Sequence, residues 1–374
     1  MRHLRTLSGT IFLAAILSCA RVSIAQATQA DQSWSSTNQQ GSAGGAINPT
    51  RTQQSHSEVN GRVVDKTSIE RLGPDGRYVP FSDTEKESVR VNSTTLRTTE
   101  RTYGRDADGH RTLIQETQQE SRSLASGEQT VTRTMSSPDA DGAMHVTRRE
   151  SEHTREARPG VQVTNTTVLT PDGNGGMAPS LKTEQRQEHS NDGTVQSKKS
   201  TLLPDGNGGW QLSEERDTTT KPDGAGTSTK EERVLRPDSD GKLAVVERTV
   251  NRESQSSSGE KSETTDTYST NVPGVAGDSS LQLVKRETTV HRNTGGGAKT
   301  TTRKIEQPPP GSPNGELHVT EEAIDIVRPG VNGTATETHT TLTSDADGHL
   351  GQVSVDMGKT NNPSAVQVDI APKK

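Results

Sequence analysis

The sequence is poor in the residues that build a hydrophobic core. Hydrophobic residues make up 25% of the 374 residues and aromatic residues only 2%, with a mean hydropathy of −0.89. Soluble globular domains have a far higher apolar share, and a chain this short of apolar side chains stays disordered unless a regular pattern organises it. Composition alone therefore predicts a largely disordered chain, and only a repeated pattern can displace that interpretation.

Cysteine and clustered positive charge are also missing. The single cysteine, Cys19, lies close to the N-terminus, so the chain beyond it has no residue for a disulfide, a thiolate nucleophile or a cysteine-ligated metal. The 43 Lys and Arg are interspersed with 49 Asp and Glu, and no basic run occurs. Because nucleic-acid binding needs clustered cations, we expect no nucleic-acid partner.

Residues 1–27 have the order of a secretory signal peptide. A basic head, Met1–Arg5, precedes the apolar run Ile11–Leu17, which is too short to span a bilayer as a helix. Small residues at Ala25 and Ala27 then provide a cleavage site, and the chain turns polar at once. We therefore expect export, with a cut after Ala25 or Ala27.

A second processing route competes with that cut. Ile16-Leu17-Ser18-Cys19 resembles the lipobox of bacterial lipoproteins, in which the signal is cut before a cysteine that becomes lipidated. The sequence predicts either a secreted, periplasmic or cell-surface protein or one held to the membrane by lipid on Cys19. It leaves the choice between the two open.

A 33-residue repeat displaces disorder as the leading interpretation. Glycines of Pro/Asp-Gly turns recur every 33 residues, and we call them the first turn series: Gly76, Gly109, Gly142, Gly175, Gly208 and Gly241, with a slip in phase through Gly277 and Gly315 before Gly348. A second turn series lies between them: Gly127, Gly160, Gly193, Gly226 and Gly259, then Gly296 and Gly330. Pro presets φ, Asp and Asn fold back on the backbone, and Gly takes the positive φ of tight turns.

The segments between the turns read as strands. They are about ten to twelve residues long and rich in Thr, Val and Ser, which disfavours helix. Within 243–250 we expect the odd-numbered residues on one face and the even-numbered residues on the other. Only Pro80 and Pro179 fall inside expected strands, where proline is unusual. The repeat therefore predicts tandem antiparallel β-hairpins.

Apolar residues gather beside the first turn series. Leu203 comes before Pro204 and Leu235 before Pro237. We expect these two leucines to occupy equivalent positions in neighbouring hairpins and to share one buried apolar stripe.

The expected organisation has four parts. The signal peptide, 1–27, precedes a disordered Gln/Ser/Gly-rich linker at 28–57 and a β-hairpin region of about eight repeats at 58–358. A tail at 359–374 holds an expected last strand, Ala365–Ile370. The hairpins form either an elongated, twisted antiparallel meander or a stack of hairpins, because open sheets of some sixteen strands usually curl or split.

The aromatic content also bears on the membrane. A membrane β-barrel has strands of this length but needs an unbroken lipid-facing apolar band with aromatic girdles. Two Trp, three Tyr and two Phe cannot supply one, so we expect no membrane span, although a lipid anchor on Cys19 stays open.

Four turns carry the pattern Asp-x-Asp-Gly, which is similar to part of a calcium loop. An EF-hand loop also needs an acid two residues earlier and a Glu six residues after the Gly, and of the four turns only the one at Gly241 has that Glu, Glu247. Hairpin turns are the better interpretation, with weak calcium binding by some turns left open. His110 and His349 each follow such a turn, but no His-x3–5-His pair supports a metal site.

Catalytic motifs are missing. Ser42 in Gly41–Gly45 is wrongly placed for a nucleophile elbow, and no glycine-rich phosphate loop follows an apolar strand. Adjacent acids such as Glu214 and Glu215 must point to opposite faces of a strand. We expect no enzyme and no catalytic, cofactor-binding or metal-binding residue. The sequence predicts an exported structural or interaction protein (an envelope or extracellular spacer, adhesin or matrix element), with a glycan- or protein-binding repeat module as the alternative and a hydrolase less favoured.

Overall fold

The computed structural model describes residues 29–360 except 41–45, 125, 225–226, 257–258, 272–279, 310–311, 313–314, 331–333 and 346–347. Within these residues, twenty antiparallel strands form one sheet. The strands are β1 (Gln29–Gln40), β2 (Ala46–Val59), β3 (Arg62–Leu72), β4 (Tyr78–Arg90), β5 (Thr95–Arg105), β6 (Arg111–Ser123), β7 (Gln129–Pro138), β8 (Met144–Arg158), β9 (Val161–Pro171), β10 (Met177–His189), β11 (Val195–Pro204), β12 (Trp210–Gly224), β13 (Thr227–Pro237), β14 (Leu243–Gln255), β15 (Lys261–Ser269), β16 (Gln282–Asn293), β17 (Lys299–Gln307), β18 (His318–Pro329), β19 (Ala335–Ser344) and β20 (Leu350–Thr360). A single 3-10 turn, η1 (Gly295–Gly297), joins β16 to β17.

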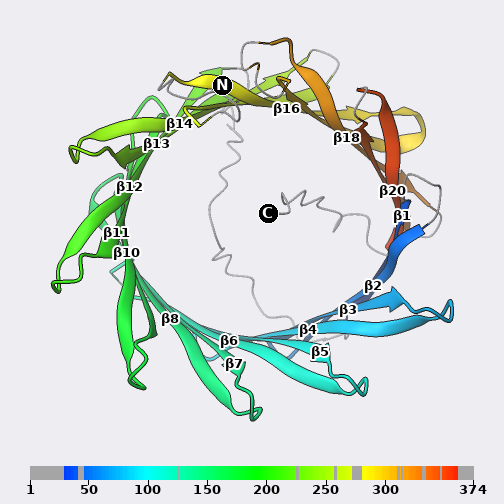
Figure 1. Cartoon of the computed structure of the whole chain (residues 1–374), viewed down its shortest axis with the longest axis horizontal. Helices are drawn as coiled ribbons and strands as arrows, with labels where there is room; N and C mark the ends of the chain where they lie inside the picture. The colour runs from blue at the N-terminus through cyan, green and yellow to red at the C-terminus, as the bar shows by residue number, and fades with distance from the viewer. Residues whose placement is uncertain are drawn as a thin grey trace, which may run out of the picture.

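The chain winds as a meander that closes on itself. Each strand pairs with the next, and β1 also pairs with β20, Ser33–Gln39 against Ser354–Thr360. Figure 1 shows the resulting ring, in which the blue start of the described chain meets the red end. The prediction of an all-β fold of antiparallel hairpins is confirmed. Closure was not predicted; it pairs the two edges that an open sheet would leave free to join other chains.

The structure corrects the boundary of the sheet. Strands β1 and β2 lie in the segment 28–57, for which the composition predicted disorder. A strand ladder pairs backbone N–H and C=O groups and does not require apolar side chains, so a Gln/Ser-rich segment can join a sheet whose neighbours are already aligned. The predicted signal peptide, the lipidation candidate Cys19 and the expected strand Ala365–Ile370 all lie outside the described residues.

The turns occur where the glycines predicted them. Glycines of both series have φ between +76° and +87°, from Gly76 in the first series to Gly160 in the second, whereas Gly315 and Gly330, after the slip in phase, lie outside the positive range. In the first series an Asp anchors the turn: Asp106 Oδ1 accepts hydrogen bonds from the backbone N–H of Asp108 (3.0 Å) and His110 (2.8 Å). Asp139, Asp172, Asp205 and Asp238 do the same.

Each hairpin of the first series contains a β-bulge at the same place. One residue of the second strand has no partner in the register, and these residues are Phe81, Ile114, Thr147, Ser180, Ser213, Val246, Val284, Thr320 and Val353. Bulges bend and twist the strand that carries them, which accounts for the hairpin tips that splay outward from the ring in Figure 1. Pro80 and Pro179 directly precede bulged residues, where a missing N–H is tolerated.

The bulge corrects the predicted alternation of faces. Val245 pairs with Leu235, but Glu247 pairs with Val234 because Val246 is skipped. Val245 and Glu247 therefore lie on opposite faces, and the expected single face for the odd-numbered residues of 243–250 is wrong.

The apolar core is thin and lies at other positions than predicted. The buried hydrophobic residues, each 1–3% exposed, are Val161, Val168, Val234, Val250, Ala323 and Ala335. Leu203 is 37% exposed, so its assignment to a buried stripe is wrong. Counted from the turn prolines, Leu202 and not Leu203 is the equivalent of Leu235, and Leu203 corresponds to Arg236. The error was one residue, which on a strand exchanges the two faces.

Two turn glycines offer a matched test of local packing. A Cβ on Gly160 (φ +77°) would lie 3.2 Å from the carbonyl oxygen of His189 in the next hairpin, whereas a Cβ on Gly109 (φ +81°) would meet nothing within 4 Å. We expect Gly109→Ala to cost about 1 kcal/mol from backbone strain alone and Gly160→Ala about 1–2 kcal/mol. Urea unfolding of both variants measures the difference, and a smaller cost at Gly160 would contradict the close approach of the two hairpins.

Candidate binding surface

Ion pairs run across neighbouring strands on both faces of the sheet. Glu215 accepts a contact from Lys198 Nζ at 2.7 Å on one face, whereas the adjacent Glu214 binds Arg216 at 2.8 Å and Arg236 at 2.9 Å on the other. The acid pair thus points to opposite faces, as the sequence predicted. Each cross-strand pair contributes about 0.2–1 kcal/mol, so these side chains support the sheet and do not form an acid/base couple.

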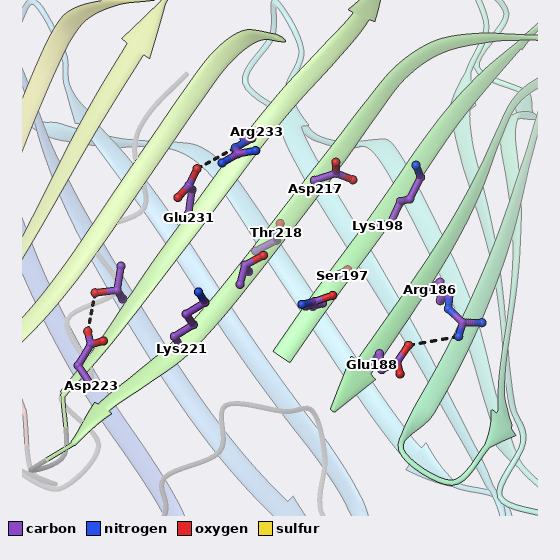
Figure 2. A pocket seen from close by; sticks show the side chains of 13 residues that line it. Arg186, Glu188, Ser197, Lys198, Asp217, Thr218, Lys221, Asp223, Glu231 and Arg233 are labelled. Atoms are coloured by element: carbon purple, nitrogen blue, oxygen red, sulfur yellow. Dashed lines mark hydrogen bonds and ion pairs between the residues drawn. The ribbon is translucent and has the colours of Figure 1, made fainter. Parts of the chain in front are cut away.

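A groove of about 680 Å³ follows strands β10 to β13. We call it the charged groove; its lining consists of Arg186, Glu188, Gln196, Ser197, Lys198, Asp217, Thr218, Thr219, Lys221, Asp223, Thr229, Glu231 and Arg233. Figure 2 shows Lys198, Lys221 and Glu231 in front of the ribbon with strands of the far wall behind it, so the groove opens on the outer face of the ring.

The charges of the groove are balanced and mostly paired. Glu231 bonds Arg233 at 2.8 Å and Arg248 at 3.0 Å; partial burial alone would raise the pKa of Glu231, but the two arginines outweigh it and hold that pKa below its ordinary value. The hydrogen bond from Glu215 raises the pKa of Lys198. Asp217 and Lys221 form no ion pair among the residues that the structure describes, which leaves one charge of each sign available to a ligand.

The groove has the chemistry of a binding surface. Its four cations and four anions give no net attraction for a polyanion, and hydroxyl groups of Thr218, Thr219 and Thr229 lie among them. No histidine or cysteine lines it, so it holds no general base near neutral pH and no strong nucleophile. Sequence reasoning missed the groove because its charges come from four strands and become neighbours only once the register is known.

The Asp-x-Asp-Gly turns act as the sequence predicted. Asp106, Asp108 and His110 bring three ligand atoms within 4.8 Å of one another, in the only such group among the described residues. Asp106 already serves the turn, and its hydrogen bond from the backbone of His110 lowers its pKa. His349 lies 3.8 Å from Asp345 in the last described turn. All of these side chains are exposed, which fits turn formation better than a closed metal site.

No helix among the described residues is long and apolar enough to cross a membrane.

The chain has no match among protein-family models, and no curated protein matches it either. Among solved structures it is similar to the siderophore receptor PirA from Pseudomonas aeruginosa, with 9% identity over 88% of this chain and 79% of that one and a TM-score of 0.45. OccK2 (OpdF) from the same organism has 11% identity over 88% and 96% of the two chains, with a TM-score of 0.39. The P pilus usher (PapC) translocation pore has 7% identity over 88% and 98%, with a TM-score of 0.33. At these scores the similarity identifies neither a family nor a function.

Proposed function

We propose that this chain is an exported, non-enzymatic structural or interaction protein of the cell envelope or the extracellular space, whose closed sheet lies in water. The observation that carries the proposal is the presence of ion-pair ladders on both faces of the same strands. Glu215 and Glu231 bind cations on the groove face, and Glu214 and Glu232 bind Arg216 on the opposite face.

A position within the hydrocarbon of a bilayer conflicts with these ladders. Charged side chains on a lipid-facing surface of a sheet cost about 2–4 kcal/mol each at the bilayer midplane for Arg and Lys. The groove face alone has Arg186, Lys198, Lys221 and Arg233 on four successive strands. A sheet with polar groups on both sides is stable when water reaches both sides, as an envelope spacer or matrix element requires.

Fractionation after export tests the proposal. We expect the exported chain with Cys19→Ala to remain in the aqueous fraction without detergent, and the purified chain not to co-float with lipid vesicles. Cys19→Ala also separates the two processing routes, because lipidation would add detergent-requiring membrane association only when Cys19 is present. Co-flotation of the Cys19→Ala chain with vesicles would contradict a sheet that lies in water.

A binding module is the second candidate, and the charged groove favours it. Asp217 and Lys221 present free charges of opposite sign beside hydroxyl groups, which suits a polar polymer or a protein segment that carries both charges. The one described tryptophan side chain, Trp210, lies at the start of β12 and does not line the groove, so stacking on sugar rings is not its mode of recognition.

Paired variants test the binding role. We expect a peptidoglycan or glycan pull-down with the wild-type chain to weaken about tenfold in Asp217→Asn/Lys221→Gln and to weaken with added salt. Asp240→Asn, in an exposed turn outside the groove, serves as the matched control. Equal capture by the wild type and the groove variant would remove the groove from consideration and leave the structural role.

A further inference from the structure

A row of polar side chains crosses the sheet between β16 and β19. His291 Nδ1 lies 3.0 Å from Thr301 Oγ1, Thr301 is paired with Asp325, and Asp325 is paired with His339. His339 Nδ1 is hydrogen-bonded to Asp325 Oδ1, and its Nε2 lies 3.1 Å from Thr341 Oγ1. Four successive strands thus place hydrogen-bonding side chains at one level of one face.

Asp325 is the unusual member of this row. It is 2% exposed, and its second carboxylate oxygen, Oδ2, is buried with no hydrogen-bond partner among the described residues. Leaving a charged oxygen buried and unpartnered is costly. The nearest arginine along β17, Arg303, is bound to Glu287 and Glu321, so it does not offset the charge. Asp325 Oδ2 therefore lacks a cationic partner.

A second carboxylate lies beside Asp325. Glu337 precedes His339 by two residues on β19 and so shares its face, one step along the strand from the Asp325–His339 pair. Burial raises the pKa of Glu337, and the negative charge of Asp325 raises it further. Two carboxylates thus face each other across adjacent strands with an imidazole next to both.

From this arrangement we propose that Asp325, Glu337 and His339 form a binding site for a divalent transition-metal ion. Residues i and i+2 of one strand, together with the residue directly opposite on its neighbour, lie within about 5–8 Å at their Cβ atoms and can converge on one point. One imidazole nitrogen and two carboxylate oxygens match Zn²⁺ and its first-row relatives better than Ca²⁺, which takes six to eight oxygens. Rotation of the Glu337 side chain toward Asp325 completes the site, and the ion supplies the partner that Oδ2 lacks.

The chain contains a natural comparison. His56 and Asp65 form the same cross-strand pair on β2 and β3, with Nδ1 2.6 Å from Oδ1, and Glu58 lies two residues from His56 on the same face. Their side chains are 45% and 47% exposed, so water hydrates both carboxylate oxygens and the drive to bind a cation is weaker. This trio has the same residue types without the buried, unpartnered oxygen.

Co²⁺ titration of the purified full chain tests the site, because protein-bound Co²⁺ has a visible absorption band that Zn²⁺ removes when it takes the same ligands. We expect a band that saturates at one ion per chain. Asp325→Asn and His339→Gln should each weaken Co²⁺ binding at least tenfold, and Asp65→Asn should leave it unchanged. Far-UV circular dichroism checks that each variant keeps its strands; Asp325→Asn preserves side-chain shape and removes a buried charge.

Three results would overturn the proposal. The wild-type chain could show no Co²⁺ band, Asp325→Asn could bind Co²⁺ as tightly as the wild type, or the band could disappear in Asp106→Asn and persist in Asp325→Asn. The last result would assign the ion to the exposed turn of Asp106, Asp108 and His110.

Discussion

Val168→Asp is expected to lower the free energy of unfolding by about 3–5 kcal/mol, because it removes a buried apolar side chain and buries a charge without a partner. Val168 is 3% exposed, and its partner on β8 is Glu150. A new carboxylate would therefore face an existing one. Val168→Thr should cost only about 1 kcal/mol, since Thr201 occupies the equivalent position in the next repeat.

Leu203→Asp is the matched control. Leu203 is 37% exposed, so the same substitution should cost less than about 1 kcal/mol. Urea unfolding gives both values, and hydrogen exchange should show lost protection confined to β8–β10 in Val168→Asp, because repeats contact mainly their neighbours. Equal costs at Val168 and Leu203 would mean that the register described above is wrong.

Asp266→Asn is expected to cost about 1–3 kcal/mol at neutral pH. Asp266 is 3% exposed and accepts hydrogen bonds from Arg286 Nε at 2.7 Å and Arg252 Nη1 at 3.2 Å. Losing one partner of a buried ion pair is usually worse, but both guanidinium groups are more than a third exposed, and water can hydrate them. Asp240→Asn, in an exposed turn, should change stability by less than about 0.5 kcal/mol.

The cost at Asp266 should depend on pH. Burial alone would raise the pKa of Asp266, but Arg286 and then Arg252 outweigh it and hold the pKa below its ordinary value, which is about 4. The unfolded chain therefore takes up the proton first as the pH falls, so this stabilisation is complete above about pH 5 and is lost as the pH drops through the lower folded pKa. Urea midpoints at pH 7 and pH 3 should show a smaller gap between wild type and Asp266→Asn at pH 3. A gap that widens at pH 3 would contradict the ion pairs.

Turns and strands could be predicted from the sequence because their signals are local. Asp106 and Gly109 specify one turn through their own backbone geometry, and their spacing of 33 residues from the next turn sets the strand length. The bulge has no such marker, since Phe81, Ile114 and Ser180 share no chemistry at the bulged position. Missing it exchanged the faces of Val245 and Glu247.

Features that depend on distant pairing could not be predicted. Ser33 and Thr360 are paired across the closure of the ring, and no local pattern connects residues so far apart. The charged groove and the Asp325–His339 pair have the same cause: each residue type is common in this sequence, and only the register places Lys198 beside Glu215 or His339 beside Asp325.

Small-angle X-ray scattering of the exported chain in detergent-free buffer tests the central claim most directly, because a closed sheet that lies in water needs no lipid to stay folded. Twenty strands spaced about 4.8 Å apart and tilted by about 40° form a ring about 40 Å across, so we expect a radius of gyration of about 25 Å and the scattering minimum of a hollow particle. A random chain of this length would have a radius of gyration of about 65 Å. A value near 65 Å, or a chain that stays in solution only with detergent, would contradict the account.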